Sequence, residues 1–229
     1  MEHSMRYCLH DVTRNFLGMD SRRDNLREHE FWALQNVSFS LYQGEALAII
    51  GKNGAGKSTL LKTVQGIYEP DKGDIYIHDR MTELVELGTS FHHDYTGREN
   101  IWINASVLGL SDKEIKNAVD SIIAFADIGD FINSPVKYYS TGMRMRLAFS
   151  IAVHCPSSIL LVDEILNTGD AEFVEKCHKK IDELLSRGAS MILVTHNLEM
   201  AKKFSAQRWY KICRKWSCRS HSSRGSKLH

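Results

Sequence analysis

A glycine-rich turn between an apolar run and a helix carries the most specific chemistry in this chain. Gly51, Gly56, Lys57 and Ser58 match the spacing G-x-x-x-x-G-K-[ST]. Glycines let the backbone curl until successive N–H groups point inward, next to the positive end of the following helix. Such a loop cradles phosphates, with the lysine reaching the β- and γ-phosphates and the serine hydroxyl placed to ligate Mg²⁺.

The turn therefore predicts a nucleoside triphosphate site rather than an ordinary strand-to-helix turn. The β-branched residues before it and the Leu60-Leu61 pair after it argue against a chance match. The expected ATP-binding residues of the loop are Gly51, Asn53, Gly54, Ala55, Gly56, Lys57, Ser58 and Thr59.

Two adjacent carboxylates follow the apolar run Ile159–Val162. The end of a buried strand delivers Asp163 to the crevice where α/β sheets bind ligands, and Asp163 can hold Mg²⁺ through water. Glu164 can orient an attacking water or accept its proton. Acidic pairs at strand ends are common, so the interpretation gains its strength from the phosphate loop that precedes it.

Two further candidates lie at element ends. His196 follows the apolar run Met191–Thr195 and is predicted to sense the γ-phosphate, although a lone histidine is more often a packed or exposed residue. Ser140, Thr141 and Gly142 open an apolar helix and resemble an anion site. An ordinary N-cap is the alternative, and spacing alone slightly favours it.

Strands and helices must alternate to position these residues. The strand Ala46–Ile50 follows a hairpin turn at Tyr42–Glu45 and leads into the loop. Other segments with strand character are Arg6–Val12, Phe31–Leu41, Asp74–His78, Ile159–Val162 and Ala189–Thr195. Helices are expected up to about Gly66, over most of 90–150 with a capping box at Ser111 and Glu114, and over Phe173–Ser186. Continuous apolar strands that alternate with helices predict a parallel α/β sheet.

Composition narrows the class of protein. The 229 residues fit one domain with room for a subdomain, and we expect a cytosolic chain because neither a membrane span nor an apolar leader is visible. The five scattered cysteines argue against a zinc site or a disulfide framework. Seven of the 29 lysines and arginines, and none of the acids, lie in residues 206–229. The remaining chain is mildly acidic, so nucleic acid is not an expected partner.

These motifs together resemble the ATP-binding subunits of ABC transporters over roughly residues 5–205. Gly51–Ser58 is similar to their Walker A motif, and Ile159–Glu164 to Walker B with its catalytic glutamate. His196 is similar to the switch histidine. Ser140–Met143 is similar to the family signature, with Ser-Thr-Gly-Met in place of the usual Ser-Gly-Gly-Gln, and Asp170 ends the D-loop segment.

The departures together resemble one subfamily, the exporters of O-antigen, capsule and teichoic acid. The segments that carry this resemblance are Phe31–Leu34, Glu86–Gly88, Thr96–Asn100, Tyr139–Met143 and Gly169–Phe173. No glutamine lies between residues 82 and 100, so Glu86 is the candidate for the glutamine-loop position and a further Mg²⁺ contact. Phe16, by its place after the first strand, and Trp32, by its distance before the loop, are the two candidates for stacking on adenine.

The resemblance implies a P-loop NTPase (RecA-like) α/β core with a mostly parallel sheet, an N-terminal antiparallel β part and an inserted helical subdomain. The expected ATP-binding domain is 1–205, with its core at about 1–88 and 151–205 and the helical subdomain at about 89–150. Residues 206–229 form a basic, atypical tail. The tail is either a Trp-containing segment on an anionic membrane or an out-of-frame, disordered sequence, and its composition favours the second.

The resemblance also implies a mechanism. A head-to-tail homodimer would hold two ATP molecules with Mg²⁺, each between Gly51–Thr59 of one copy and Ser140–Gly142 of the other. Hydrolysis would drive an integral membrane permease through the 86–100 region, at the cytoplasmic face of the inner (cytoplasmic) membrane. The exported lipid-linked polysaccharide would be contacted mainly by the permease. A soluble cassette ATPase without a permease and a hydrolysis-impaired nucleotide-binding module are the alternatives.

Overall fold

The computed structural model describes residues 6–10, 32–35, 37–84, 90–163, 170–204, 208–212 and 221–222. The chain divides into two compact units, one formed by residues 1–79 with 190–229 and the other by residues 80–189. Phe16, Glu86, Glu164 and the D-loop residues before Asp170 lie outside the described residues. Within the described ranges, no helix combines the length and the apolar character needed to cross a membrane.

The first unit is built around strand β3 (Ala46–Gly51). β7 (Ser190–Thr195) and β8 (Arg208–Ile212) pair with it in parallel, and β9 (His221–Ser222) pairs with β8 in antiparallel fashion. Every residue of β7 is buried, and so are five of the six in β3. Strands that are covered on both faces need continuous apolar runs, which explains why Ala46–Ile50 and Met191–Val194 do not alternate with polar residues.

A small antiparallel sheet completes the β part of this unit. β1 (Arg6–His10) pairs with both β2 (Ser40–Tyr42) and β4 (Asp74–Ile75). A turn closed by the Glu45 N–H and the Tyr42 carbonyl then leads into β3. Two helices, α1 (Lys57–Val64) and α6 (Leu198–Phe204), belong to the same unit.

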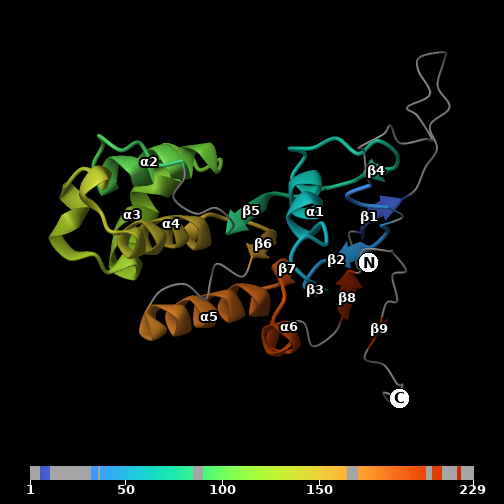
Figure 1. Ribbon diagram of the computed structural model, residues 1–229. Coiled ribbons are helices and arrows are strands. Elements are labelled where there is room, and N and C mark those ends of the chain that lie inside the picture. The colour runs from blue at the N-terminus through green and yellow to red at the C-terminus, as the bar shows by residue number, and fades with distance from the viewer. Residues whose placement is uncertain are drawn as a thin grey trace, which may run out of the picture. The chain divides into compact units, whose positions relative to one another are not determined.

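The second unit is mostly helical and is labelled in Figure 1 by α2 (Gly97–Val107), α3 (Asp112–Ala126), α4 (Thr141–His154) and α5 (Ala171–Ser186). It also holds the parallel pair β5 (Met81–Leu84) and β6 (Ile159–Asp163), and two short 3₁₀ helices, η1 (Gly129–Asn133) and η2 (Val136–Tyr138). One apolar cluster joins α2, α3 and α4, with Ile101, Ile115, Ile122 and Leu147 fully buried. The predicted capping box is confirmed, because Glu114 accepts a hydrogen bond from the Ser111 N–H at 2.8 Å.

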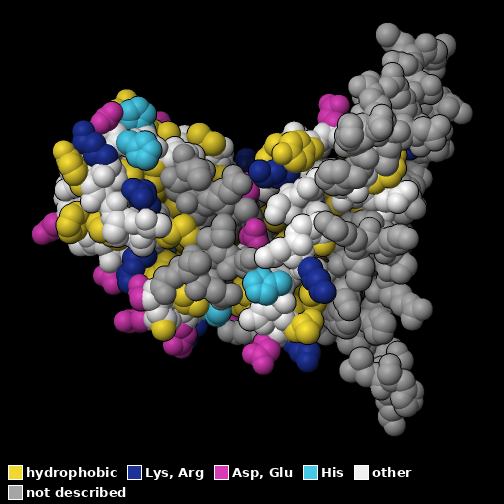
Figure 2. Space-filling model, viewed as in Figure 1, with side chains coloured by type: hydrophobic (Ala, Val, Ile, Leu, Met, Phe, Trp, Pro, Cys, Tyr) yellow, Lys and Arg dark blue, Asp and Glu magenta, His cyan; other side chains and the backbone are white. Residues whose placement is uncertain are grey.

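The exposed surface carries charges of both signs, which are interspersed on the face drawn in Figure 2. Along α5, Lys179 pairs with Glu175, and Lys180 and Arg187 pair with Glu183. Such i,i+3 and i,i+4 pairs stabilise a helix only modestly. These charged residues form a polar face of α5, whereas Phe173, Cys177 and Ile181 of the same helix are buried.

The α/β fold class is confirmed, and three local expectations differ from the structure. The strand expected over Phe31–Leu41 is limited to Ser40–Tyr42, because Ala33 and Leu34 bend against the phosphate loop. The strand expected over Asp74–His78 has two residues. The tail, in which no strand pattern was recognised, contributes β8 beside β3. A strand edge recruits neighbours through its backbone N–H and C=O groups, so pairing there does not require an apolar pattern.

Candidate nucleotide-binding site

The phosphate loop leaves the sheet at the end of β3 and curls into α1. The Ala55 N–H donates to the Lys52 carbonyl at 3.1 Å and closes the turn. Gly54 has φ 74° and Gly56 has φ 94°, a left-handed conformation that costs other residues about 1–2 kcal/mol. Glycine is therefore required at these two positions by the backbone itself.

Lys57 is folded back over this loop. The residue is 9% exposed, and its Nζ donates a hydrogen bond to the Lys52 carbonyl at 3.2 Å. Ser58 lies exposed on the first turn of α1, and the apolar residues Leu60, Leu61 and Val64 bury the opposite side of the helix. The lysine is thus held with its ammonium group at the loop while the serine hydroxyl faces outward.

The N-terminus of α1 differs from those of three longer helices. Side chains of Thr96, Ser140 and Asp170 accept backbone N–H groups at the starts of α2, α4 and α5. Gly56 provides no such cap to α1, and the first turn of α1 contains no acidic residue. The first intrahelical bond is Leu60 N–H to the Gly56 carbonyl, so the preceding amides have no acceptor within the helix. This donor set fits an anionic phosphate chain.

His196 emerges at the same edge of the sheet as the phosphate loop. Ile50 of β3 is paired with Thr195 of β7, so the next residues, Gly51 at the end of β3 and His196 after β7, lie at the same end of neighbouring parallel strands. The Thr195 hydroxyl accepts the Asn197 N–H at 2.9 Å, and Asn197 Oδ1 accepts the Glu199 N–H at 2.8 Å. These bonds fix the backbone on the C-terminal side of His196.

Ala33 and Leu34 lie against the phosphate loop, a relationship that the sequence did not reveal. A Cβ placed on Gly56 would lie 2.7 Å from the Ala33 carbonyl oxygen and 2.9 Å from Leu34 Cδ2. Ala33 and Leu34 therefore support the loop from outside the motif. Trp32, next to Ala33, is half-buried.

The remaining predicted residues belong to the second unit. Asp163 ends β6 and is half-buried. Ser140 caps α4 by accepting the Met143 N–H at 3.2 Å, so its N-cap role is confirmed, and Thr141 and Gly142 are exposed beside it. Asp170 caps α5 by accepting the Phe173 N–H at 2.8 Å. That hydrogen bond, together with one from Arg146, lowers the pKa of the Asp170 carboxyl.

A buried asparagine organises the loop that follows the glutamine-loop region. Asn100 donates to the carbonyls of His92, Tyr95 and Thr96 and accepts the His92 N–H at 2.8 Å. A capping box between Thr96 and Glu99 starts α2 immediately before it.

The same loop is bonded to the segment that precedes the signature. The carbonyls of His93 and Tyr95 accept the N–H groups of Lys137 and Val136, each at 2.9 Å. Lys137 also pairs with Asp94 at 3.0 Å. Residues 93–95 are therefore joined directly to residues 136–137, three positions before Ser140, although the chain separates them by about forty residues.

A sequence model described as ABC transporter matches residues 34–167. The O-antigen export system ATP-binding protein RfbB of Klebsiella pneumoniae is 43% identical over 76% of this chain and 70% of its own length. RfbB of Myxococcus xanthus is 45% identical over 77% of this chain, which spans 39% of that relative. The teichoic acids export ATP-binding protein TagH of Lactiplantibacillus plantarum is 42% identical over 88% of this chain and 58% of its own length.

Two solved structures share the fold. An ATP-binding subunit of an ABC transporter superimposes with a TM-score of 0.77 at 20% identity, covering 95% of this chain and 90% of that one. A dimeric, post-hydrolysis ATP-binding cassette with bound ADP and Pi gives 0.75 at 22% identity, covering 97% of this chain and all of the other.

Proposed function

Because this chain belongs to the ABC transporter family, we propose that it is the ATP-hydrolysing subunit of a polysaccharide exporter. The substrate class is a cell-surface glycan of O-antigen, capsule or teichoic-acid type, as the names of the relatives suggest. The observation that carries the nucleotide part of this proposal is the uncapped start of α1 beside Gly54, Gly56 and Lys57.

The phosphate loop holds the triphosphate. Amides at the start of α1 and the Lys57 ammonium neutralise the phosphate oxygens, and the helix dipole adds to this. Ser58 and Asp163 offer the hard oxygen ligands that Mg²⁺ prefers, with Glu86 as a further candidate. Mg²⁺, when bound, supplies charge neutralisation between the β- and γ-phosphates. Trp32 is favoured over Phe16 for stacking on adenine, because its neighbours Ala33 and Leu34 pack on Gly56.

Hydrolysis requires a positioned water and a group that detects the γ-phosphate. Glu164 orients the attacking water or accepts its proton, and His196 contacts the γ-phosphate. The shared edge of β3 and β7 supports this role for His196. Among the motifs recognised in the sequence, no other residue is a candidate for positioning the water or for contacting the γ-phosphate.

Two copies are required for a complete site. Ser140, Thr141, Gly142 and Met143 of one copy close over ATP bound to the other, and Asp170 ends the D-loop of the same copy. The exposure of Thr141 and Gly142 at the start of α4 supports a contact in trans. The 86–100 region receives the permease at the cytoplasmic face of the membrane, and the bonds from residues 93–95 to 136–137 offer a route from it toward Ser140.

Glu164→Gln tests the assignment. We expect this variant to bind ATP, to accumulate as an ATP-bound dimer in size-exclusion chromatography, and to lose nearly all phosphate release. Lys57→Ala serves as the control that loses nucleotide binding and hence dimerisation. ATPase activity in Glu164→Gln equal to that of the original protein contradicts the role of Glu164.

Coupling to transport is tested with the membrane partner. ATPase activity should change when the cassette is co-purified with its membrane permease and reconstituted in vesicles. Identical turnover with and without the permease supports the soluble cassette ATPase instead. An absence of turnover in both states supports the hydrolysis-impaired module.

A further inference from the structure

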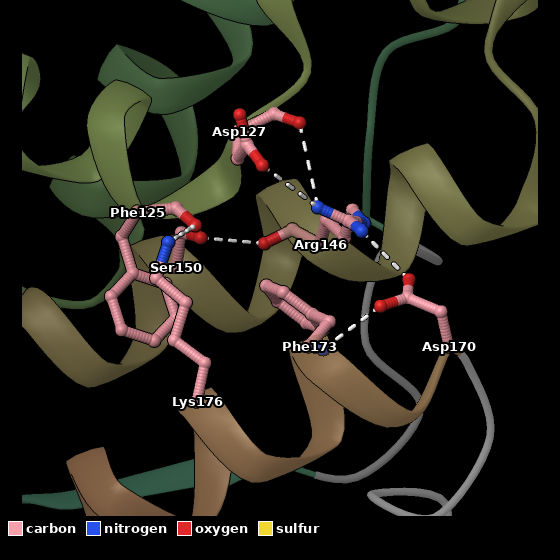
Figure 3. A network of polar contacts seen from close by, with 7 residues as sticks. All are labelled: Phe125, Asp127, Arg146, Ser150, Asp170, Phe173 and Lys176. Carbon is pink, nitrogen blue, oxygen red and sulfur yellow. Dashed lines mark hydrogen bonds and ion pairs between the residues drawn. The ribbon is translucent and has the colours of Figure 1, made fainter.

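Arg146 joins three helices of the second unit through a single side chain (Figure 3). It lies on α4, three residues after Met143, and its guanidinium group reaches the start of α5 and the end of α3. Nη2 lies 2.7 Å from Asp170 Oδ2. Nη1 lies 3.4 Å from the Asp127 carbonyl oxygen and 3.5 Å from Asp127 Oδ2. The guanidinium carbon also lies 4.8 Å from the centre of the Phe173 ring.

The geometry of this junction suits arginine specifically. The side chain is 24% exposed, so most of its stem is buried while its planar fork serves two carboxylates and one aromatic face. Lysine carries one compact ammonium group and cannot bridge Asp127 and Asp170 while stacking on Phe173. Asp127 has φ 49° at the C-cap of α3, and the guanidinium group satisfies its carbonyl oxygen there.

Lys176 of α5 makes a parallel set of contacts but does not reach Asp170. Its Nζ donates to the Phe125 carbonyl at 2.9 Å and lies 4.6 Å from the centre of the Phe125 ring. Both cations therefore satisfy carbonyls in the last turn of α3 and rest on an aromatic ring. They differ because Arg146 also pairs with the carboxylates of Asp127 and Asp170, and through Asp170 it ties the cap of α5 to the signature helix.

We propose that Arg146 is a positioning residue that holds the signature helix α4 and Asp170 in one fixed arrangement. This inference rests on the proposed function, in which Ser140–Met143 and the D-loop both face the second copy. With the Arg146–Asp170 link in place, Ser140–Met143 and the Asp170 cap of α5 meet the partner in one fixed arrangement. Without this link, α5 and the signature helix α4 each keep their own N-cap, but they lose the contact that fixes the position of one helix start relative to the other.

The test uses variants that separate the link from the caps. Arg146→Met keeps an unbranched apolar stem and removes the fork. Asp170→Asn keeps an oxygen that accepts the Phe173 N–H but loses the charge partner of Arg146. Lys176→Met is the matched control, since it removes a cation, a carbonyl contact and an aromatic contact at the same junction without touching Asp170.

We expect monomeric ATP affinity to stay within about twofold in all three variants, because the phosphate loop lies in the other unit. ATP-driven dimerisation, measured in the Glu164→Gln background, should weaken about tenfold for Arg146→Met and for Asp170→Asn. With Glu164 intact, both substitutions should lower kcat while the KM for ATP is unchanged. The double variant should be no worse than either single one. Arg146→Lys should recover part of the loss, and Lys176→Met should match the parent protein.

The inference is overturned if Arg146→Met and Lys176→Met behave alike, or if the losses of Arg146→Met and Asp170→Asn add. It is also overturned if Arg146→Met dimerises like the parent. If Arg146→Met fails to fold, as judged by circular dichroism, Asp170→Asn decides the question alone. Should Glu164→Gln without any further substitution show no ATP-driven dimer, the proposed function fails first. This outcome is distinguishable because it appears while Arg146 and Asp170 are both unchanged.

Discussion

Ile50 and Thr195 are register partners in the parallel pair β3–β7, so the next residues, Gly51 at the end of β3 and His196 after β7, lie at the same end of these strands. This relationship places the start of the phosphate loop and His196 at the same end of β3 and β7. Gly51 ends β3 and His196 follows β7, and the pairing of those strands fixes the spacing of their ends.

His196→Ala should therefore lower ATP turnover by about a hundredfold, because a positioned proton-transfer or γ-phosphate group contributes on that scale. Nucleotide affinity should change little, since the loop and Lys57 are untouched. Phosphate release under saturating ATP measures the effect, with His78→Ala as an exposed histidine control from the same unit. Normal turnover in His196→Ala would remove this residue from the site.

Glycine is needed at positions 54 and 56 of the loop for different reasons. Both have positive φ, but a Cβ on Gly54 meets nothing within 4 Å, whereas one on Gly56 collides with the Ala33 carbonyl oxygen. Gly54→Ala should cost about 1 kcal/mol of unfolding free energy, and Gly56→Ala about 3 kcal/mol, with loss of ATP binding. Urea unfolding and nucleotide titration measure both. Equal losses in the two variants would show that Ala33 and Leu34 do not constrain the loop.

The pairing of β8 with β3 predicts different stabilities for two shortened proteins. A chain ending at residue 205 lacks β8, whereas one ending at residue 212 keeps its five register pairs with β3. Net backbone hydrogen bonds of about 1 kcal/mol each suggest that the shorter protein loses about 3–5 kcal/mol. Its ATP affinity should fall as well, because Ile212 pairs with Gly51. Chemical unfolding of both proteins measures the difference, and equal stabilities would argue that the tail adds nothing to the sheet.

Two buried thiols predict an alkaline loss of stability. Burial raises the pKa of Cys155 and of Cys177 to about 12. An unfolded thiol ionises near pH 8.5, so the unfolded chain binds fewer protons than the folded chain above that pH. The free energy of unfolding should then fall by about 1.4 kcal/mol per pH unit for each thiol as pH rises from about 9 toward 12.

Urea unfolding between pH 8 and 10.5 measures this slope. Replacing both cysteines by alanine should flatten it, while replacing Cys8, which belongs to another element, serves as the comparison. An unchanged slope in the double variant would assign the alkaline effect to other groups.

Features that depend on local sequence were predictable in this chain. The loop from Gly51 to Ser58, the capping box of Ser111 and Glu114, and the apolar strands that became β6 and β7 each have short-range causes. The fold class followed from the alternation of such elements, and the family resemblance followed from their motifs. The site roles of all the predicted residues stay predictions, and Glu164, Phe16 and Glu86 also lie outside the described ranges.

Features that depend on distant partners were not predictable. Ala33 looked like part of a strand, yet its carbonyl packs on Gly56, and no local pattern encodes that approach. No local pattern around Arg146 indicates that Asp127 and Asp170 converge on it from two other elements. The tail strand formed because β3 offers a second edge, which is a property of the sheet rather than of the tail.

The first unit is assembled from two separate pieces of chain, and this has a consequence for biosynthesis. β3 has β7 on one side and β8 on the other, and both are translated after the whole of residues 80–189. The second unit is continuous in sequence, so it can fold around its apolar cluster on the ribosome while both edges of β3 are still unpaired. The nascent phosphate-loop segment therefore presents an aggregation-prone strand for more than a hundred codons, which makes it the stage at which a chaperone has most to protect.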